Sequence, residues 1–162
     1  QAEPLIEIFK EIRKQDWVFS TWRSSYHALL KGMPEEELFQ MILDGRSMYV
    51  ISSKHRILCS SIVGGILPIA LGVAMGAKIH GLDEKAWVCC GDMASRTGLF
   101  HEFLQYCQGH ELPVHIVVED NGLSTDSETD FVWGMSPWKE ITTTYKYERT
   151  EAHVGVGSHV VF

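Results

Sequence analysis

Residues 89–125 read CCGDMASRTGLFHEFLQYCQGHELPVHIVVEDNGLST and decide the fold. A first apolar run, AWVCC at 86–90, overlaps the start of this stretch and is followed by Gly91-Asp92. A second apolar run, over 113–118, ends shortly before Asn121. Uninterrupted apolar strands are typical of parallel sheets buried on both faces. Between the two runs, apolar residues recur at helical intervals, which predicts a helix over 98–109 with these side chains turned inward: Leu99, Phe100, Phe103, Leu104 and Cys107. The stretch therefore predicts a strand–helix–strand unit in an α/β domain with a doubly wound, mostly parallel sheet and helices on both faces.

Patterns elsewhere in the chain extend this unit. Apolar spacing predicts a helix over 3–14, and Pro34 with the glutamates that follow it predicts a second helix that ends at Gly45. A glycine-rich loop at 60–65 leads into a buried helix, 66–79. Residues 46–60 are expected to be irregular. The remaining apolar segments are expected to add a short run and two late strands, at 17–21, 145–147 and 159–162.

Composition limits the class of protein. A length of 162 residues fits one domain, 1–162, and a net charge of −7 argues against a nucleic-acid partner. The apolar runs are broken by glycine and proline and are too short to span a membrane. Four cysteines without CxxC spacing and the lack of a signal peptide favour a reduced, cytoplasmic setting.

Oxygen-bearing side chains follow both strands of the central unit. Asp92 and Asn121 should lie at the same edge of the sheet, because ligands of open parallel sheets sit outside the carboxyl ends of the strands. A carboxylate and an amide oxygen suit Mg²⁺, which completes its coordination with water and phosphate oxygens. Gly91 allows close backbone approach, and a helix that begins near 95–98 would point N–H groups at an anion. The edge therefore predicts a phosphate-bearing ligand held through a divalent cation, although both residue types also favour simple turns.

Gly91-Asp92, followed about thirty residues later by Asn121, resembles the binding motif for thiamine diphosphate. In that motif the aspartate, the asparagine and a backbone carbonyl hold Mg²⁺ on the diphosphate, and the carbonyl position here is Leu123. Trp22-Arg23 followed by His27 resembles a Tyr-Arg-x-His-x-His segment whose arginine contacts the diphosphate. Ser61-Ile62-Val63-Gly64 resembles a Gly-Ile-Val-Gly loop that touches the aminopyrimidine.

These motifs together resemble the α subunit of two-chain E1 components of 2-oxoacid dehydrogenases. The resemblance implies a thiamine-diphosphate-binding domain, thiamine diphosphate and Mg²⁺ as cofactors, and Mg²⁺ ligands at Asp92, Asn121 and Leu123. It implies a cofactor-binding set made of Trp22, Arg23, Ser61, Val63, Gly91, Asp92, Met93, Ala94, Asn121, Leu123 and Ser124. His27 and His153 are the candidate catalytic side chains, and for each a structural role remains open.

The implied activity is decarboxylation of a small-molecule 2-oxoacid such as pyruvate and transfer of the acyl fragment. A β-like partner would supply the glutamate on the pyrimidine side of the cofactor, since no matching motif for it stands in this chain, and an α₂β₂ heterotetramer is expected. Two alternatives remain. One is a transketolase-like half-enzyme that transfers a ketol unit, and the other is a cofactor-free scaffold subunit.

Departures from the family pattern motivate the second alternative. Met93 and Ser61 stand where the motifs have glycine, Ser25 stands where many α subunits have histidine, and 95–97 reads Ser-Arg-Thr in place of a typical Ala-Asn-Gln. The short distance from Asn121 to Tyr145 predicts that a strand–helix unit of longer relatives is missing. The match of the first residues to the middle of a family segment predicts the same for an N-terminal helix. The HELPVH run at 110–115 and the Gly-Val-Gly at 155–157 fit neither a zinc hydrolase nor a dinucleotide fingerprint.

Overall fold

The computed structural model describes residues 2–134 and 142–148. In chain order their elements are α1 (Ala2–Phe9), β1 (Trp17–Thr21), α2 (Ser25–Leu30), α3 (Glu35–Leu43), β2 (Ile51–Ser52), β3 (Ile57–Ser60), α4 (Ile66–Ile79), β4 (Ala86–Gly91), the 3₁₀ turn η1 (Ala94–Arg96), α5 (Gly98–Gly109), β5 (Val114–Asp120), β6 (Leu123–Ser124), β7 (Ser127–Glu128), α6 (Thr129–Trp133) and β8 (Thr143–Lys146).

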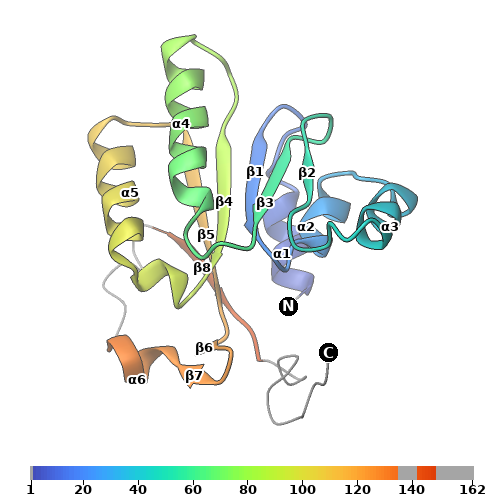
Figure 1. Ribbon diagram of the computed structural model, residues 1–162. Helices are drawn as coiled ribbons and strands as arrows, with labels where there is room; N and C mark the ends of the chain where they lie inside the picture. Colours follow the sequence, from blue (N-terminus) through green and yellow to red (C-terminus); the bar gives the residue numbers. More distant parts are fainter. Residues whose placement is uncertain (1, 135–141, 149–162) are drawn as a thin grey trace.

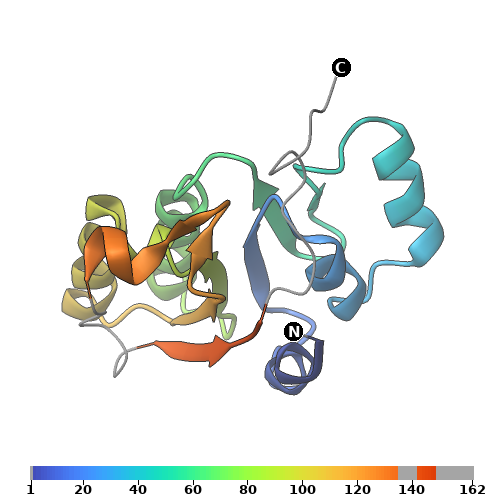
Figure 2. The ribbon, with the colours of Figure 1, turned by 90° about the horizontal axis from the view of Figure 1, so that it is seen from below.

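The main sheet of the described residues has the strand order β2-β3-β1-β4-β5-β8. β2 pairs antiparallel with β3, and every other neighbouring pair is parallel. The carboxyl ends of the parallel strands therefore lie along one edge. In Figure 1 this edge is the lower one, where β5 leads into β6, β7 and α6, and Figure 2 looks onto it from below.

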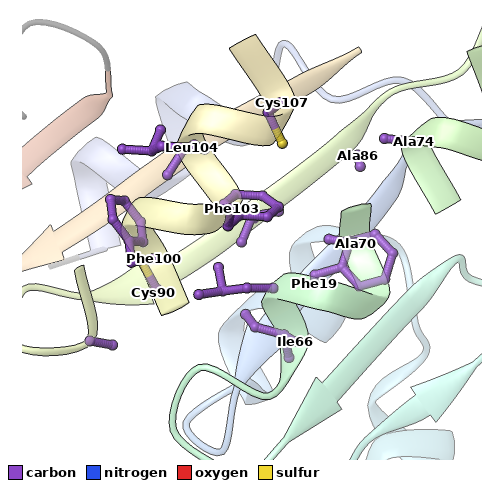
Figure 3. Close-up of a cluster of buried hydrophobic side chains, with 14 of the residues drawn as sticks. Phe19, Ile66, Ala70, Ala74, Ala86, Cys90, Phe100, Phe103, Leu104 and Cys107 are labelled. Carbon is purple, nitrogen blue, oxygen red and sulfur yellow. The ribbon is translucent and has the colours of Figure 1, made fainter. Parts of the chain in front are cut away.

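Helices cover both faces of the sheet, which confirms the predicted class. On one face α4 and α5 pack against alternate strand residues such as Phe19, Val88 and Cys90. Figure 3 shows Phe100, Phe103 and other side chains of α5 turned toward α4 and the sheet. On the other face α1, α2 and α3 contact the intervening positions, among them Val18, Trp87, Cys89 and Val117. Strand residues that alternate between two apolar layers explain why these strands read as continuous apolar runs.

Most predicted elements are present with close bounds. The structure confirms the helices over 35–43, 66–79 and 98–109 and both strands of the central unit. α1 ends at Phe9, five residues before the predicted helix ends. The prediction that 46–60 is irregular is wrong, because β3 lies inside the sheet next to β1. Leu99 was predicted to point inward, but it is 39% exposed. The predicted strand at 159–162 lies outside the described residues.

Within residues 2–134 and 142–148, no helix combines the length and the apolar character that a membrane crossing needs. α4 is the most apolar of them and has 14 residues. Its small residues Ala70, Ala74 and Ala77 are buried, as expected for a helix that packs closely in a protein core.

A buried carboxylate joins the start of β1 to the start of β4. Asp16 is 1% exposed and accepts hydrogen bonds from the Arg13 side chain at 2.9 Å and from the backbone N–H of Lys85 at 3.0 Å. Burial alone would raise the pKa of Asp16, but the hydrogen bonds from Arg13 and Lys85 hold it below its ordinary value. This link fixes the end of the sheet opposite to the carboxyl ends of the strands.

Asp16→Asn is expected to lower the free energy of unfolding by about 2 kcal/mol at neutral pH, because charge-assisted buried hydrogen bonds are lost. A carboxylate with a depressed folded-state pKa stabilises the fold above its unfolded pKa and loses that contribution as the pH falls through the folded value. The difference between the two proteins should therefore shrink toward acid pH. Urea unfolding at several pH values measures it.

Asp83→Asn is the matched control. Asp83 pairs with the same Arg13 guanidinium at 2.8 Å, but its side chain is 87% exposed, so the loss should stay below about 1 kcal/mol. Equal losses in the two variants would contradict the structural role assigned to Asp16.

Candidate functional site

A cavity of about 190 Å³ opens at the carboxyl edge of the sheet, and residues at the ends of β1, β3, β4, β5 and β8 line it. β1 is followed by α2 on one face of the sheet, whereas its neighbour β4 is followed by α5 on the other face. The connections thus diverge between these two strands. Open α/β sheets bind ligands at such a switch point.

The structure brings the whole predicted cofactor-binding set to this cavity. Trp22 and Arg23 follow β1, and Ser61 and Val63 follow β3. The segment after β4 supplies Gly91, Asp92, Met93 and Ala94, and the segment after β5 supplies Asn121, Leu123 and Ser124. These segments are far apart in the sequence, and the fold of the sheet brings them together around one cavity.

Asp92 and Asn121 meet because β4 and β5 are paired to their ends. The register pairs Gly91 with Glu119, so both polar residues lie just past the last paired positions. The backbone N–H of Asn121 also donates to the Asp92 carboxylate. The two side chains that the sequence places about thirty positions apart are therefore neighbours at one edge.

The environment of Asp92 disfavours its charge. Asp92 is 5% exposed, and burial raises the pKa of its carboxyl, with a further contribution from the nearby negative charge of Asp120. The hydroxyl of Thr129 donates to Asp92 Oδ2 and opposes this shift. In the part of the chain that the structure describes, no lysine, arginine or histidine lies within salt-bridge distance of Asp92. A cation placed here would stabilise the ionised carboxylate.

The turn after Asn121 has a defined shape. Asn121 Oδ1 accepts the backbone N–H of Leu123 at 3.0 Å, which makes an Asx turn. Gly122 has a φ of +70°, a conformation in which other residues are strained. An amide oxygen has two lone pairs, so this hydrogen bond leaves Asn121 Oδ1 able to accept once more.

Arg23 supplies positive charge to the cavity. Its guanidinium lies over the Trp22 ring, 4.8 Å from the centroid, and the side chain is exposed. No described carboxylate lies within salt-bridge distance of it. A guanidinium stacked in this way is pre-ordered for two parallel hydrogen bonds to an anion.

The loop between β3 and α4 forms another wall of the cavity. Gly64 has a φ of +75°, and a Cβ added there would come within 3.1 Å of the Leu99 side chain, so the sharp turn requires glycine. Ser60 Oγ accepts the backbone N–H of Ile62 at 3.2 Å. Ile62 and Val63 are 72% and 67% exposed, which is unusual for aliphatic side chains on a cavity wall.

Glu119 is a cavity residue that the sequence reasoning missed. It is 9% exposed, and its Oε1 accepts from Tyr145 at 2.5 Å and lies 3.1 Å from His27 Nε2. Burial alone would raise the pKa of Glu119, but these hydrogen bonds and the charge of His27 hold it below its ordinary value. The available signal was a glutamate at the end of an apolar strand, since such residues are seldom buried without partners.

His27 lies behind Glu119 and does not line the cavity. It is 2% exposed, its Nδ1 is 2.5 Å from Ser20 Oγ, and its ring stacks on Phe9 with centroids 5.6 Å apart. The histidine thus links β1 to β5 through the core. His153, the other candidate catalytic residue, lies outside the described residues.

Contrary to the prediction, the N terminus of α5 does not line this cavity. The cavity wall ends at Ala94, the 3₁₀ turn η1 follows, and α5 begins only at Gly98. Thr97 caps α5 by accepting the backbone N–H of Phe100 at 3.4 Å. The N–H groups of Phe100 and His101 are therefore used locally.

The residues present fit a divalent cation that carries a diphosphate. Among the described residues, Asp92 is a buried carboxylate with no cationic side chain within salt-bridge distance, and Arg23 has no carboxylate within that distance. A Cβ added to Gly91 would meet no atom within 4 Å, so space beside Asp92 is open. No group of three or more His, Cys, Asp or Glu side chains in residues 2–134 and 142–148 could form a metal cage. Few protein ligands, completed by phosphate and water, are what Mg²⁺ prefers.

Comparison with known proteins agrees with this geometry. Residues 5–131 match the dehydrogenase E1 component family. The chain is 29% identical to the alpha subunit of acetoin:2,6-dichlorophenolindophenol oxidoreductase from Cupriavidus necator, over 78% of this chain and 41% of that protein. It is 29% identical to the chloroplastic pyruvate dehydrogenase E1 component subunit alpha-3 of Oryza sativa, over 93% of this chain and 38% of the relative.

Further relatives show the same pattern. The 2-oxoisovalerate dehydrogenase subunit alpha of Bacillus subtilis is 32% identical over 67% of this chain and 36% of its own length. The chain therefore spans well under half the length of these relatives. Among solved structures, a candidate thiamin diphosphate-dependent enzyme from Mycobacterium smegmatis superposes with a TM-score of 0.50 at 16% identity, over 75% of this chain and 20% of that one. That similarity supports the fold alone.

His27→Ala is expected to lower the free energy of unfolding by about 3 kcal/mol, because it removes a donor from the buried charge of Glu119 and leaves a cavity beside Phe9. Urea unfolding at neutral pH measures the loss. The matched control is Tyr26→Ala at the neighbouring position, which is 63% exposed and should change stability by about 0.5 kcal/mol or less. If His27→Ala were as stable as the native chain, the link between β1 and β5 through His27 would contribute nothing to the free energy of unfolding.

Proposed function

Because the chain belongs to the dehydrogenase E1 component family, we propose that it acts as the α-like subunit of a two-chain thiamine-diphosphate enzyme. The substrate class is a small 2-oxoacid, which is decarboxylated before its acyl fragment is transferred. The observation that carries the proposal is the meeting of separate predicted segments around one cavity, with Asp92 and Arg23 opposite in charge on its wall.

The proposed roles follow from the chemistry of each side chain. Asp92, the amide oxygen of Asn121 and the backbone carbonyl of Leu123 hold Mg²⁺ on the diphosphate. Arg23 neutralises phosphate oxygens with its guanidinium. The Ser61–Val63 segment borders the pyrimidine side of the cofactor. When bound, thiamine diphosphate supplies the stabilised carbanion that cleavage next to a 2-oxo group requires, and the protein positions it.

A second chain completes the site in this proposal. The cavity volume of about 190 Å³ is below the roughly 300–1,000 Å³ of pockets that enclose whole small molecules. Ile62 and Val63 are largely exposed beside it, and exposed apolar surface of this kind supports contact with another protein. We propose a β-like subunit that supplies the glutamate on the pyrimidine side, in an α₂β₂ assembly. Isolated, this chain should bind the cofactor weakly.

The names of the relatives support the substrate class. Two of the matched relatives are named as dehydrogenases of pyruvate and of 2-oxoisovalerate, and both are described as alpha subunits. The roles of Asp92 and Arg23 concern the diphosphate alone, so they hold for every 2-oxoacid of this class.

Asp92→Asn is expected to abolish the Mg²⁺-dependent part of thiamine-diphosphate binding, because it keeps the size of the side chain and removes its charge. Since burial disfavours that charge, the variant should remain at least as stable as the native chain without ligand. Calorimetric titration with and without Mg²⁺, on the chain together with its β-like partner, measures binding. Asp126→Asn, an exposed carboxylate outside the cavity, is the charge-matched control. If the affinity for thiamine diphosphate were the same with and without Mg²⁺ and the same in Asp92→Asn as in the native chain, the proposal would be refuted.

Arg23→Met is expected to weaken thiamine-diphosphate binding by about 2 kcal/mol, roughly thirtyfold, because it removes a charge-assisted contact to phosphate. Thiamine without phosphates serves as the control ligand, and its affinity should not change. The same titration measures both ligands on both proteins. An equal loss for thiamine would mean that Arg23 acts on the shape of the cavity and not on the diphosphate.

A further inference from the structure

The short helix α6 is tied to the segment that carries Asp92. We use the name α6 strap for residues 130–134, which follow Thr129. In addition to the Thr129–Asp92 contact, Arg96 donates to Asp130 Oδ1 at 2.9 Å and to the backbone carbonyl of Gly134 at 2.8 Å. Trp133 Nε1 lies 2.9 Å from the sulfur of Met93. Figure 1 shows α6 below α5, at the carboxyl edge of the sheet.

Thr129 is placed for contact with Asp92 by its backbone and by its burial. It is 1% exposed, and its N–H donates to the carbonyl of Gly122 at 2.9 Å, which anchors it to the turn that carries Asn121. Its hydroxyl reaches Asp92 from there. One residue therefore contacts the segments that hold both predicted metal-binding side chains.

The strap also accounts for two departures from the thiamine-diphosphate motif. Met93 stands at a glycine position of the motif, and its sulfur contacts Trp133. Arg96 stands in the segment that reads Ser-Arg-Thr, and its side chain, 8% exposed, forms both polar contacts to the strap. In this chain the Met93 sulfur and the Arg96 side chain contact α6, and a Cβ added to Gly91 still meets no atom within 4 Å, while Met93 also lines the cavity.

We propose that Thr129 is a positioning residue of the cation site and that the α6 strap holds it in place. A donor on Oδ2 restricts rotation of the Asp92 carboxylate, so the group is ordered before a cation arrives. Groups that orient metal ligands in this way typically contribute a factor of 10–100 to metal affinity. The inference rests on the proposed function and adds to it a residue outside the motif.

The test compares Thr129→Val, which keeps the shape and removes the hydroxyl, with Thr129→Ser, which keeps the hydroxyl. For each, the Mg²⁺ concentration that half-saturates thiamine-diphosphate binding is measured by calorimetry on the chain with its β-like partner. We expect an increase of about tenfold or more for Thr129→Val and of less than about twofold for Thr129→Ser. Thr143→Val, on β8 and outside the cavity lining, is the matched control and should behave as native.

A second measurement tests the strap without relying on Thr129→Val alone. Arg96→Met removes the polar contacts of Arg96 to the strap and keeps the Thr129 hydroxyl, so it should raise the Mg²⁺ requirement by a smaller factor. If the strap acts through Thr129, this increase should disappear when Arg96→Met is combined with Thr129→Val. Thermal unfolding without ligand shows whether each variant is folded.

The outcomes separate the two proposals. A native chain that shows no Mg²⁺-dependent binding would overturn the proposed function and this inference together. Native binding with an unchanged Mg²⁺ requirement in Thr129→Val, or with equal loss in Thr129→Ser, would overturn the inference alone. Fully additive effects of Arg96→Met and Thr129→Val would show that the strap does not act through Thr129.

Discussion

The parallel pairing of β4 with β5 is the constraint on which the site depends. Their register runs from Ala86 opposite Val114 to Gly91 opposite Glu119. It brings Asp92 and Asn121 to the same edge. A shift of one residue would move every side chain of a strand to the opposite face and would separate the two polar residues. The helices α4 and α5 on one face and α1 to α3 on the other hold this register through two apolar layers.

Three buried carboxylates differ in which groups donate hydrogen bonds to them and in the direction of their pKa shifts. Asp16 and Glu119 are buried. Arg13 and Lys85 donate to Asp16, and His27 and Tyr145 donate to Glu119, and the pKa of each carboxyl is lowered from its ordinary value. Asp92 is equally buried, but its donors are a neutral hydroxyl and backbone N–H groups, and its pKa is raised. A buried charge is costly without compensation, and Asp92 is the member of this set that has no cationic side chain within salt-bridge distance among the described residues.

The sequence predicted the elements whose signal is local. The apolar runs of β4 and β5 and the spacing within α5 depend on neighbouring residues, and the motifs placed the cavity residues before the fold was known. β3 was missed because the run ILCS is short and its partner, β1, is distant in sequence. The link from His27 to Glu119 joins residues 92 positions apart, and no periodicity encodes such a pair. The same holds for the contact of Thr129 with Asp92, which joins residues 37 positions apart.

The contacts of the α6 strap explain how the polar segment after β5 is held at the edge of the sheet. Residues 123–128 form the short β6–β7 hairpin and lead into α6, and α6 turns back onto the segment after β4. The segments after β4 and β5 are therefore joined twice, by strand pairing above the cavity and by Thr129 beside it. An ordered carboxylate loses little further freedom when it binds a cation. In the proposed function, a partner surface next to the exposed Ile62 and Val63 would hold the rest of the cofactor, and this chain would contribute the anchor for its diphosphate.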